Sequence, residues 1–131
     1  MAETFTKAER LCSQKLIDQL FAGGNATMAA FPLRVIYRLS DRTESDAVPV
    51  SVLISVPKKR LRLAVDRNRM KRQVREAYRR HKQSLWERLE ASGKRMEMAF
   101  ICISDEPCES SRVRGSVQKI LRRVEEAVAV S

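Results

Sequence analysis

Apolar side chains recur along this chain with two periods, and each period predicts a different kind of element. Residues 7–22 carry apolar side chains at the spacing of a helix, namely Leu11, Ile17, Leu20 and Phe21. The pair Gly23-Gly24 follows and would end that helix. Over residues 31–39 the period changes to two. This alternation puts Leu33, Val35, Tyr37 and Leu39 on one face and Arg34, Ile36 and Arg38 on the other, and predicts a strand with one solvated side.

A second run of β-branched residues spans residues 48–56. Pro49 would stand at its start and Pro57 at its end. One face of the expected strand carries Val50, Val52, Ile54 and Val56, and the opposite face carries Ser51 and Ser55. Residues 98–103 form another apolar run, which predicts a further strand.

Two more helices are expected in the second half of the chain. Residues 67–89 are strongly basic with an apolar stripe, and Ala91-Ser92-Gly93 would end this helix. Ser110 and Ser111 are candidate N-caps of a last helix, whose stripe we assign to the core: Val113, Val117, Ile120, Leu121, Val124 and Val128. The 131 residues show no repeat or long linker, so one domain over residues 1–131 is expected, an α+β sandwich with an antiparallel or mixed sheet.

The positive charge is concentrated in one window. The chain has 26 Lys and Arg against 16 Asp and Glu, a formal charge of +10. Residues 58–82 hold twelve of these bases and only Asp66 and Glu76 as acids, so the rest of the chain is formally neutral. Such a local excess favours a polyanionic partner over an ordinary solvated helix.

On a helix, the basic window separates into two faces. Met70, Val74, Ala77, Tyr78, His81, Leu85 and Leu89 form the side expected to pack on the sheet. Another side carries Asn68, Lys71, Arg72, Arg75, Arg79 and Lys82, a ridge of about 20 Å at 1.5 Å per residue. Because this ridge offers mainly guanidinium groups, it favours recognition of phosphates and RNA shape over reading of DNA bases.

No constellation predicts catalysis by this chain. His81 has no histidine or cysteine neighbour, and the acids of residues 41–46 and 105–109 lie in expected loops. Neither a Gly-rich phosphate loop nor a Ser/His/Asp set is present. Three cysteines, Cys12, Cys102 and Cys108, form neither a zinc motif nor a disulfide framework, which favours a reducing cytoplasm. No apolar run is long enough to span a bilayer, so no membrane partner is expected.

The middle of the chain resembles the protein subunit of bacterial ribonuclease P. The similarity rests on Ser55-Val56-Pro57-Lys58-Lys59, then Ala64-Val65, then Arg67-Asn68-Arg69-Met70-Lys71-Arg72 with Arg75-Glu76. It extends to the family's opening pattern at Phe5, Lys7, Arg10 and Leu11, and to its first-helix ending at Leu20-Phe21 with Gly24. Length and element order agree as well, so the resemblance covers nearly the whole chain, densely in the middle and loosely after Arg95.

The resemblance implies both a fold and a role. The fold would be an αββ(β)αβα sandwich of the ribosomal protein S5 domain 2-like type, with the basic helix after a left-handed crossover. The protein would be an accessory subunit of an endoribonuclease, monomeric with one copy per RNA, that binds the catalytic ribonuclease P RNA and the 5′ leader of precursor tRNA. That RNA would perform the magnesium-dependent hydrolysis and hold most of the Mg²⁺, with no ion bound by the protein alone.

Two sets of residues would carry this role. The RNA-binding set comprises Lys58, Lys59, Arg60, Arg62, Arg67, Asn68, Arg69, Lys71, Arg72, Arg75, Arg79 and Lys82. The candidates for a leader cleft are Ile17, Phe21, Tyr37 and Ser55. Aromatic side chains in basic grooves stack on single-stranded bases, although Phe21 and Tyr37 fit core positions equally well.

The chain departs from the family pattern at two places. Ile17 stands where the family often has an aromatic residue. Residues 59–64 lack the usual glycine and are one residue longer, so the turn before the basic helix must take another form. Asp66 would lie near the helix N-terminus, where a carboxylate favours the helix dipole.

Two other functions fit parts of the same pattern. A stand-alone RNA-binding or ribosomal-type protein would explain the basic window, and a protein-only nuclease would need a carboxylate metal site that the spacing does not predict. RNA binding alone does not separate the three hypotheses. Cleavage of precursor tRNA, tested with and without the catalytic RNA, does.

Overall fold

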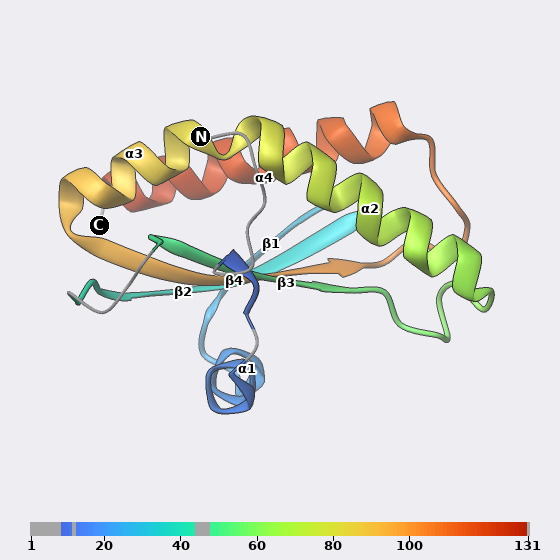
Figure 1. Ribbon diagram of the computed structural model, residues 1–131, viewed down its shortest axis with the longest axis horizontal. Helices are drawn as coiled ribbons and strands as arrows, with labels where there is room; N and C mark the ends of the chain where they lie inside the picture. Colours follow the sequence, from blue (N-terminus) through green and yellow to red (C-terminus); the bar gives the residue numbers. More distant parts are fainter. Residues whose placement is uncertain (1–8, 12, 44–47, 131) are drawn as a thin grey trace.

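The structure of the protein is a computed structural model, and it describes residues 9–11, 13–43 and 48–130. Within these residues a four-stranded sheet lies between helix α1 on one side and helices α2, α3 and α4 on the other (Figure 1). The elements are α1 (Gln14–Phe21), β1 (Ala26–Ala30), β2 (Leu33–Asp41), β3 (Val50–Ser55), α2 (Ala64–His81), α3 (Gln83–Ser92), β4 (Lys94–Cys102) and α4 (Ser110–Val130). The predicted α+β sandwich is confirmed.

The sheet is mixed, which is one of the two types that the sequence left open. Its strands lie in the order β1-β2-β4-β3. The pairs β1-β2 and β2-β4 are antiparallel, whereas β3 and β4 are parallel neighbours. Two parallel neighbours need a connection that crosses one face of the sheet. Helices α2 and α3 form this crossover, and the basic helix therefore lies over the sheet.

A continuous core fills the space between the sheet and helices α2, α3 and α4. Strand side chains that point to this side include Leu33, Val35, Val50, Val52, Met96, Met98 and Phe100, and the predicted stripe of α4 is buried against them. Tyr78 of α2 meets Phe100 edge to face, with ring centroids 6.2 Å apart. Burial raises the pKa of Tyr78, whose hydroxyl accepts a 2.9 Å hydrogen bond from the indole of Trp86.

A smaller cluster lies on the opposite face, under α1. It consists of Leu11, Leu20, Ile36 and Ala99. The prediction that this side of β2 is solvated is wrong at Ile36, which is only 8% exposed because α1 covers it. It holds at Arg34, which is exposed. Helix α1 therefore covers only part of this face.

The first helix begins later than predicted. Arg10 forms a parallel bridge with Val52, and the Leu11 N–H donates to the Val52 carbonyl at 2.9 Å. The backbone here bonds to the edge of the sheet instead of continuing a helix, and Ser13 caps the start of α1 with its hydroxyl. The predicted start at Lys7 is therefore wrong for the described part, and Lys7 itself lies outside the described residues.

Strand β1 is not predicted by any apolar pattern; it fills the place of the additional strand that the αββ(β)αβα order allows. Its residues, ATMAA, show no alternation of large apolar and polar side chains. Only Met28 and Ala30 are partly buried against the core. The strand forms because its backbone pairs with all of the first half of β2, from Leu33 to Tyr37.

The boundaries of β4 and α4 also differ from the predicted ones. β4 begins at Lys94 rather than at residue 98. α4 begins at Ser110, and the Glu109 carbonyl accepts the N–H of Val113, so the predicted N-cap role of Ser110 and Ser111 is wrong. None of the helices in the described residues has the length and apolar content to cross a bilayer.

The predicted single helix over residues 67–89 is two helices. α2 starts earlier, at Ala64, and ends at His81, and α3 continues from Gln83 after a break at Lys82. Asp66 lies in the first turn of α2, as predicted. Gly93 ends α3 in the left-handed conformation with φ 67°, which favours glycine.

Candidate nucleic-acid interface

One side of α2 carries a row of polar and basic side chains. Helical spacing places Met70, Val74, Ala77 and Tyr78 in the core. It leaves a row along the outer side that we call the cationic ridge: Asn68, Lys71, Arg72, Arg75 and Arg79. Asn68 and Arg72 are exposed, and the other three are half-buried. Arginine side chains in such a row suit the bidentate binding of successive phosphates.

Glu76 pairs with Arg79 of the ridge and with Arg80 beside it. Arg79 donates to both carboxylate oxygens, with a distance of 3.1 Å from Nε to Oε2, and Arg80 Nε donates to Oε1 at 3.1 Å. The hydrogen bonds from Arg79 and then Arg80 lower the pKa of Glu76 to about 2. Within the described residues, Lys71, Arg72 and Arg75 have no acidic partner. Most of the ridge is therefore electrostatically uncompensated.

The connection before α2 adds further cations. Lys58, Lys59 and Arg62 are exposed. Arg60 pairs with Asp105, with 3.1 Å between Nη1 and Oδ1. This connection thus extends the basic surface beyond the N-terminus of α2.

The turn in this connection takes a form without glycine. The N–H groups of Arg60 and Leu61 both donate to the Pro57 carbonyl, at 3.0 and 3.2 Å, and Leu61 is buried. Arg67 Nη1 donates to the carbonyls of Leu61 and Arg62, at 2.9 and 2.7 Å. The Arg67 side chain therefore fastens the turn to α2, a structural role that the sequence analysis did not foresee.

The placement of Lys82 on the predicted ridge is wrong. Its side chain is 1% exposed and lies 2.7 Å from Glu9 Oε1, with Nζ 4.4 Å from the centre of the Trp86 ring. Lys82 follows Tyr78 by four residues, so it shares the buried side of the helix. It is a structural cation and no part of the surface.

A groove of about 340 Å³ lies between α2 and α4. Its lining consists of Arg69, Arg72, Gln73, Glu76, Ala77 and Arg80 of α2 with Ser110 and Arg114 of α4. Gln73 Nε2 donates to the Cys108 carbonyl and to Ser110 Oγ, both at 3.0 Å, and so joins the start of α4 to α2. Sequence reasoning missed Arg114, although residues 110–123 contain five bases and no acid.

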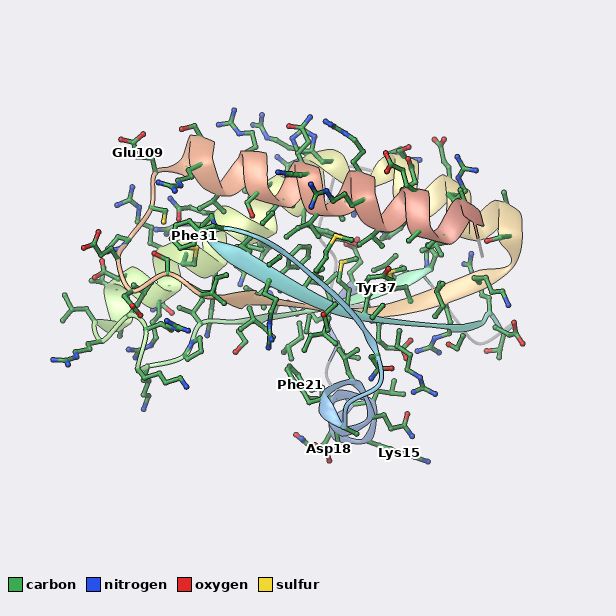
Figure 2. The ribbon with its side chains drawn as sticks, turned by 180° about the vertical axis from the view of Figure 1, so that it is seen from behind. Lys15, Asp18, Phe21, Phe31, Tyr37 and Glu109 are labelled. Atoms are coloured by element: carbon green, nitrogen blue, oxygen red, sulfur yellow. The ribbon has the colours of Figure 1, made fainter. Side chains whose placement is uncertain are left out.

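The candidates for a leader cleft do not all come together. Ile17 and Phe21 lie on α1, and Phe21 is 45% exposed. Ser55 shares their side of the sheet, because it alternates with the core residues of β3, and it is half-buried. Tyr37 is only 7% exposed and belongs to the core on the other face, so its candidacy is wrong. Figure 2 shows Tyr37 on the α4 side of the sheet and Phe21 on the α1 side.

The remaining candidates for chemistry are dispersed. In the part of the chain that the structure describes, no three His, Cys, Asp or Glu side chains gather where they could hold a metal ion. Asp41 pairs with Lys94, whose hydrogen bond and charge lower the pKa of that carboxyl. Burial raises the pKa of the Cys102 thiol. Of the loop acids considered above, Glu44 and Asp46 lie outside the described residues, as does Cys12.

Comparison with known proteins identifies the family. The chain matches the Ribonuclease P family over residues 5–125. It is 43% identical over 119 residues to the ribonuclease P protein component of Porphyromonas gingivalis, an alignment that covers 91% of this chain and 85% of that relative. The chain belongs to the ribonuclease P protein family. The family assignment made from the sequence, and with it a part in tRNA processing by ribonuclease P, is confirmed.

Solved structures from the ribonuclease P protein family share the fold. The RNase P protein of Staphylococcus aureus superposes with a TM-score of 0.68 at 19% identity, over 90% of this chain and 96% of that chain. The RNase P protein of Thermotoga maritima gives 0.65 at 22% identity, over 88% and 96%. The sandwich expected from the resemblance is thus confirmed. Of the four residues that match the family's opening motif, the structure describes Arg10 and Leu11, whereas Phe5 and Lys7 lie outside the described residues.

Proposed function

We propose that the protein binds the catalytic RNA of ribonuclease P through the cationic ridge and the basic connection before α2. The observation that carries this proposal is the uncompensated charge of Lys71, Arg72 and Arg75 on one side of a helix that the core holds rigidly. Fixed guanidinium groups bind phosphates at a low entropic cost. Family membership supplies the identity of the RNA.

In this proposal the protein assists the removal of the 5′ leader from precursor tRNA. The catalytic RNA performs the hydrolysis and holds most of the Mg²⁺, as the resemblance implies, and no side chain of this protein acts as a catalytic residue. One protein molecule serves one RNA in the cytoplasm. The positive surface lowers the repulsion between the two RNAs and so favours their association.

The leader would lie against the α1 side of the sheet. Phe21 offers an exposed aromatic ring there, and Ile17 and Ser55 are half-buried beside the same layer. Arg34 is exposed on the same face of β2 and adds a cation. A ring for base stacking together with a cation for the backbone suits a single strand of RNA.

The decisive experiment is cleavage of a precursor tRNA at low magnesium by the protein alone, by the cognate ribonuclease P RNA alone, and by both together. We expect strong 5′ maturation only in the mixture. Cleavage by the protein alone would instead require a metal site in the chain. Equal cleavage by the RNA with and without the protein would indicate that the protein is a general RNA-binding domain.

A binding experiment tests the ridge itself. Arg72→Ala and Arg75→Ala should each weaken binding to the catalytic RNA and lower the slope of log K against log salt by about one. Arg88→Ala removes the same charge from an exposed site on α3 and serves as the matched control. If all three variants bind equally well, the ridge is not the interface.

A further inference from the structure

We propose that the groove between α2 and α4 is a second phosphate-binding surface for the catalytic RNA, with Arg114 as its contact on α4. The inference rests on the proposed function and extends it to a helix that the basic window of the sequence does not include. The RNA backbone would leave the cationic ridge at Arg72 and continue into the groove.

The charge of the groove supports a polyanionic occupant. Four arginines and one glutamate line it. The glutamate, Glu76, is already held by Arg79 and Arg80. Among the described residues, no acid pairs with Arg69, Arg72 or Arg114. Three unpaired guanidinium groups around one hollow repel each other unless an anion separates them.

The position of Arg72 makes the groove continuous with the ridge. Arg72 is a member of the ridge and also lines the groove. On the wheel of α2 it points away from the core, between Arg75 on the ridge side and Arg69 on the groove side. A phosphate strand that contacts Arg72 therefore reaches both surfaces, which favours the catalytic RNA over the precursor tRNA as the occupant.

The groove is fixed at the start of α4, and a carboxylate lies farther along the seam between the helices. Gln73 ties its floor to Ser110 and to the Cys108 carbonyl, so Arg114 is held opposite α2. Farther along the seam, Ser84 Oγ donates to Glu125 Oε1, and this carboxylate lines a smaller hollow of about 160 Å³ between the helices. The carboxylate there would repel a phosphate. The favourable surface for RNA is therefore the α2 half of the seam.

Arg114 lines the groove, whereas the other arginines of α4 lie elsewhere, Arg122 at the smaller hollow beside Glu125. Arg112 lies over the Phe31 ring, 4.9 Å from its centre, at the β1-β2 turn. Figure 2 shows Phe31 under the start of α4, near Glu109. Arg123 follows Arg114 by nine residues, which at about 100° per residue puts it half a turn away. Arg123→Ala is thus a matched control with the same helix, the same charge and an exposed position.

The test measures the affinity of the full-length protein for ribonuclease P RNA at several salt concentrations. Arg114→Ala should weaken binding about tenfold and lower the salt slope by about one, as the loss of one charged hydrogen bond predicts. Arg123→Ala should stay within about twofold of the unchanged protein. Thermal melting of both variants checks that the fold is kept.

A double-mutant cycle tests whether the groove holds one RNA segment. If Arg72 and Arg114 grip the same segment, the loss in the double variant should differ from the product of the two single losses, whereas Arg72 and Arg123 should combine independently. Equal binding by Arg114→Ala and Arg123→Ala overturns the inference. If Arg75→Ala still weakens binding in that case, the proposed function stands without it.

A last arm separates the two RNAs. With the protein saturating the catalytic RNA, the KM for precursor tRNA should be unchanged in Arg114→Ala. A raised KM with unchanged binding of the catalytic RNA would assign the groove to the substrate and overturn the inference. Failure of the unchanged protein to bind ribonuclease P RNA would remove the proposed function and the inference together.

Discussion

The two faces of the sheet are covered to very different extents. Among the described residues, the sheet shares one core of 23 buried residues with α2, α3 and α4, whereas the cluster under α1 has four. On the first side, apolar strand positions meet apolar stripes from three helices. On the second, α1 leaves Phe21 and Arg34 exposed at its margin. Stability is concentrated on one face, and the other keeps exposed surface, where the proposed contact with the leader would lie.

The largest expected effect is a cavity on the helical face. Phe100→Ala should lower the free energy of unfolding by about 4 kcal/mol, because the ring is buried and meets Tyr78 edge to face. Ile36→Ala, under α1, should cost about 2 kcal/mol, since its smaller cluster can close the space more readily. Urea titrations of both variants give the comparison. Equal losses would contradict the contrast between the two faces.

The next effect concerns the buried cation. Lys82→Ala should cost about 3 kcal/mol, because it removes the ion pair between Lys82 and the Glu9 carboxylate in the interior. The double variant Glu9→Gln/Lys82→Met should recover most of this loss, since it removes both charges and keeps the volume. Urea titrations measure the free energy of unfolding of the single and the double variant. If the Lys82→Ala protein is as stable as the unchanged one, the assignment of Lys82 as a buried structural cation is contradicted.

A smaller effect is expected at the exposed ring of α1. Phe21→Ala should change the stability by less than about 1 kcal/mol, as for other surface positions. It should weaken binding of precursor tRNA by the holoenzyme about tenfold through loss of one stacked base. Mature tRNA and Tyr37→Phe, a change inside the core, are the controls. If Phe21→Ala weakens the binding of mature tRNA equally, Phe21 does not contact the leader.

The smallest effect is the titration of Glu76. Its pKa in the folded protein is about 2, against 4.5 for the free side chain. Its ion pairs therefore stabilise the fold fully above pH 4.5 and lose this contribution as the pH falls toward 2. The group is half exposed, so the change in stability is small and declines with salt. NMR titration of the carboxyl carbon measures the midpoint, and a value near 4.5 would show that the arginines are free.

The large apolar patterns of the sequence predicted the core well. Large apolar side chains alternate along β2 and β3 and repeat at helical spacing along α4. Burying side chains such as Val52 and Val117 requires one face of each element to point to the core. Strand β1 could not be found this way. Its alanines and threonine carry no periodic signal, and it exists only because β2 offers a free edge.

The basic residues were harder to place because charge alone does not distinguish a surface cation from a buried one. Lys82 is three residues after Arg79 and four after Tyr78, so the spacing fits either side of the helix. The partner that decides the matter, Glu9, is far away in sequence. The sequence did not point to Arg114 for a different reason. Acids elsewhere in the chain balance the basic residues of α4, so the charge count outside residues 58–82 is neutral.

The strand-like backbone at Arg10 and Leu11 affects the association of one copy of this protein with another. β3 is an outer strand of the sheet, and an outer strand with free N–H and carbonyl groups is a template for edge-to-edge association. The bond from Leu11 to Val52 occupies part of that edge within the same molecule. The protein thus covers part of one edge of its own sheet, which lowers the tendency of that edge to pair with another copy.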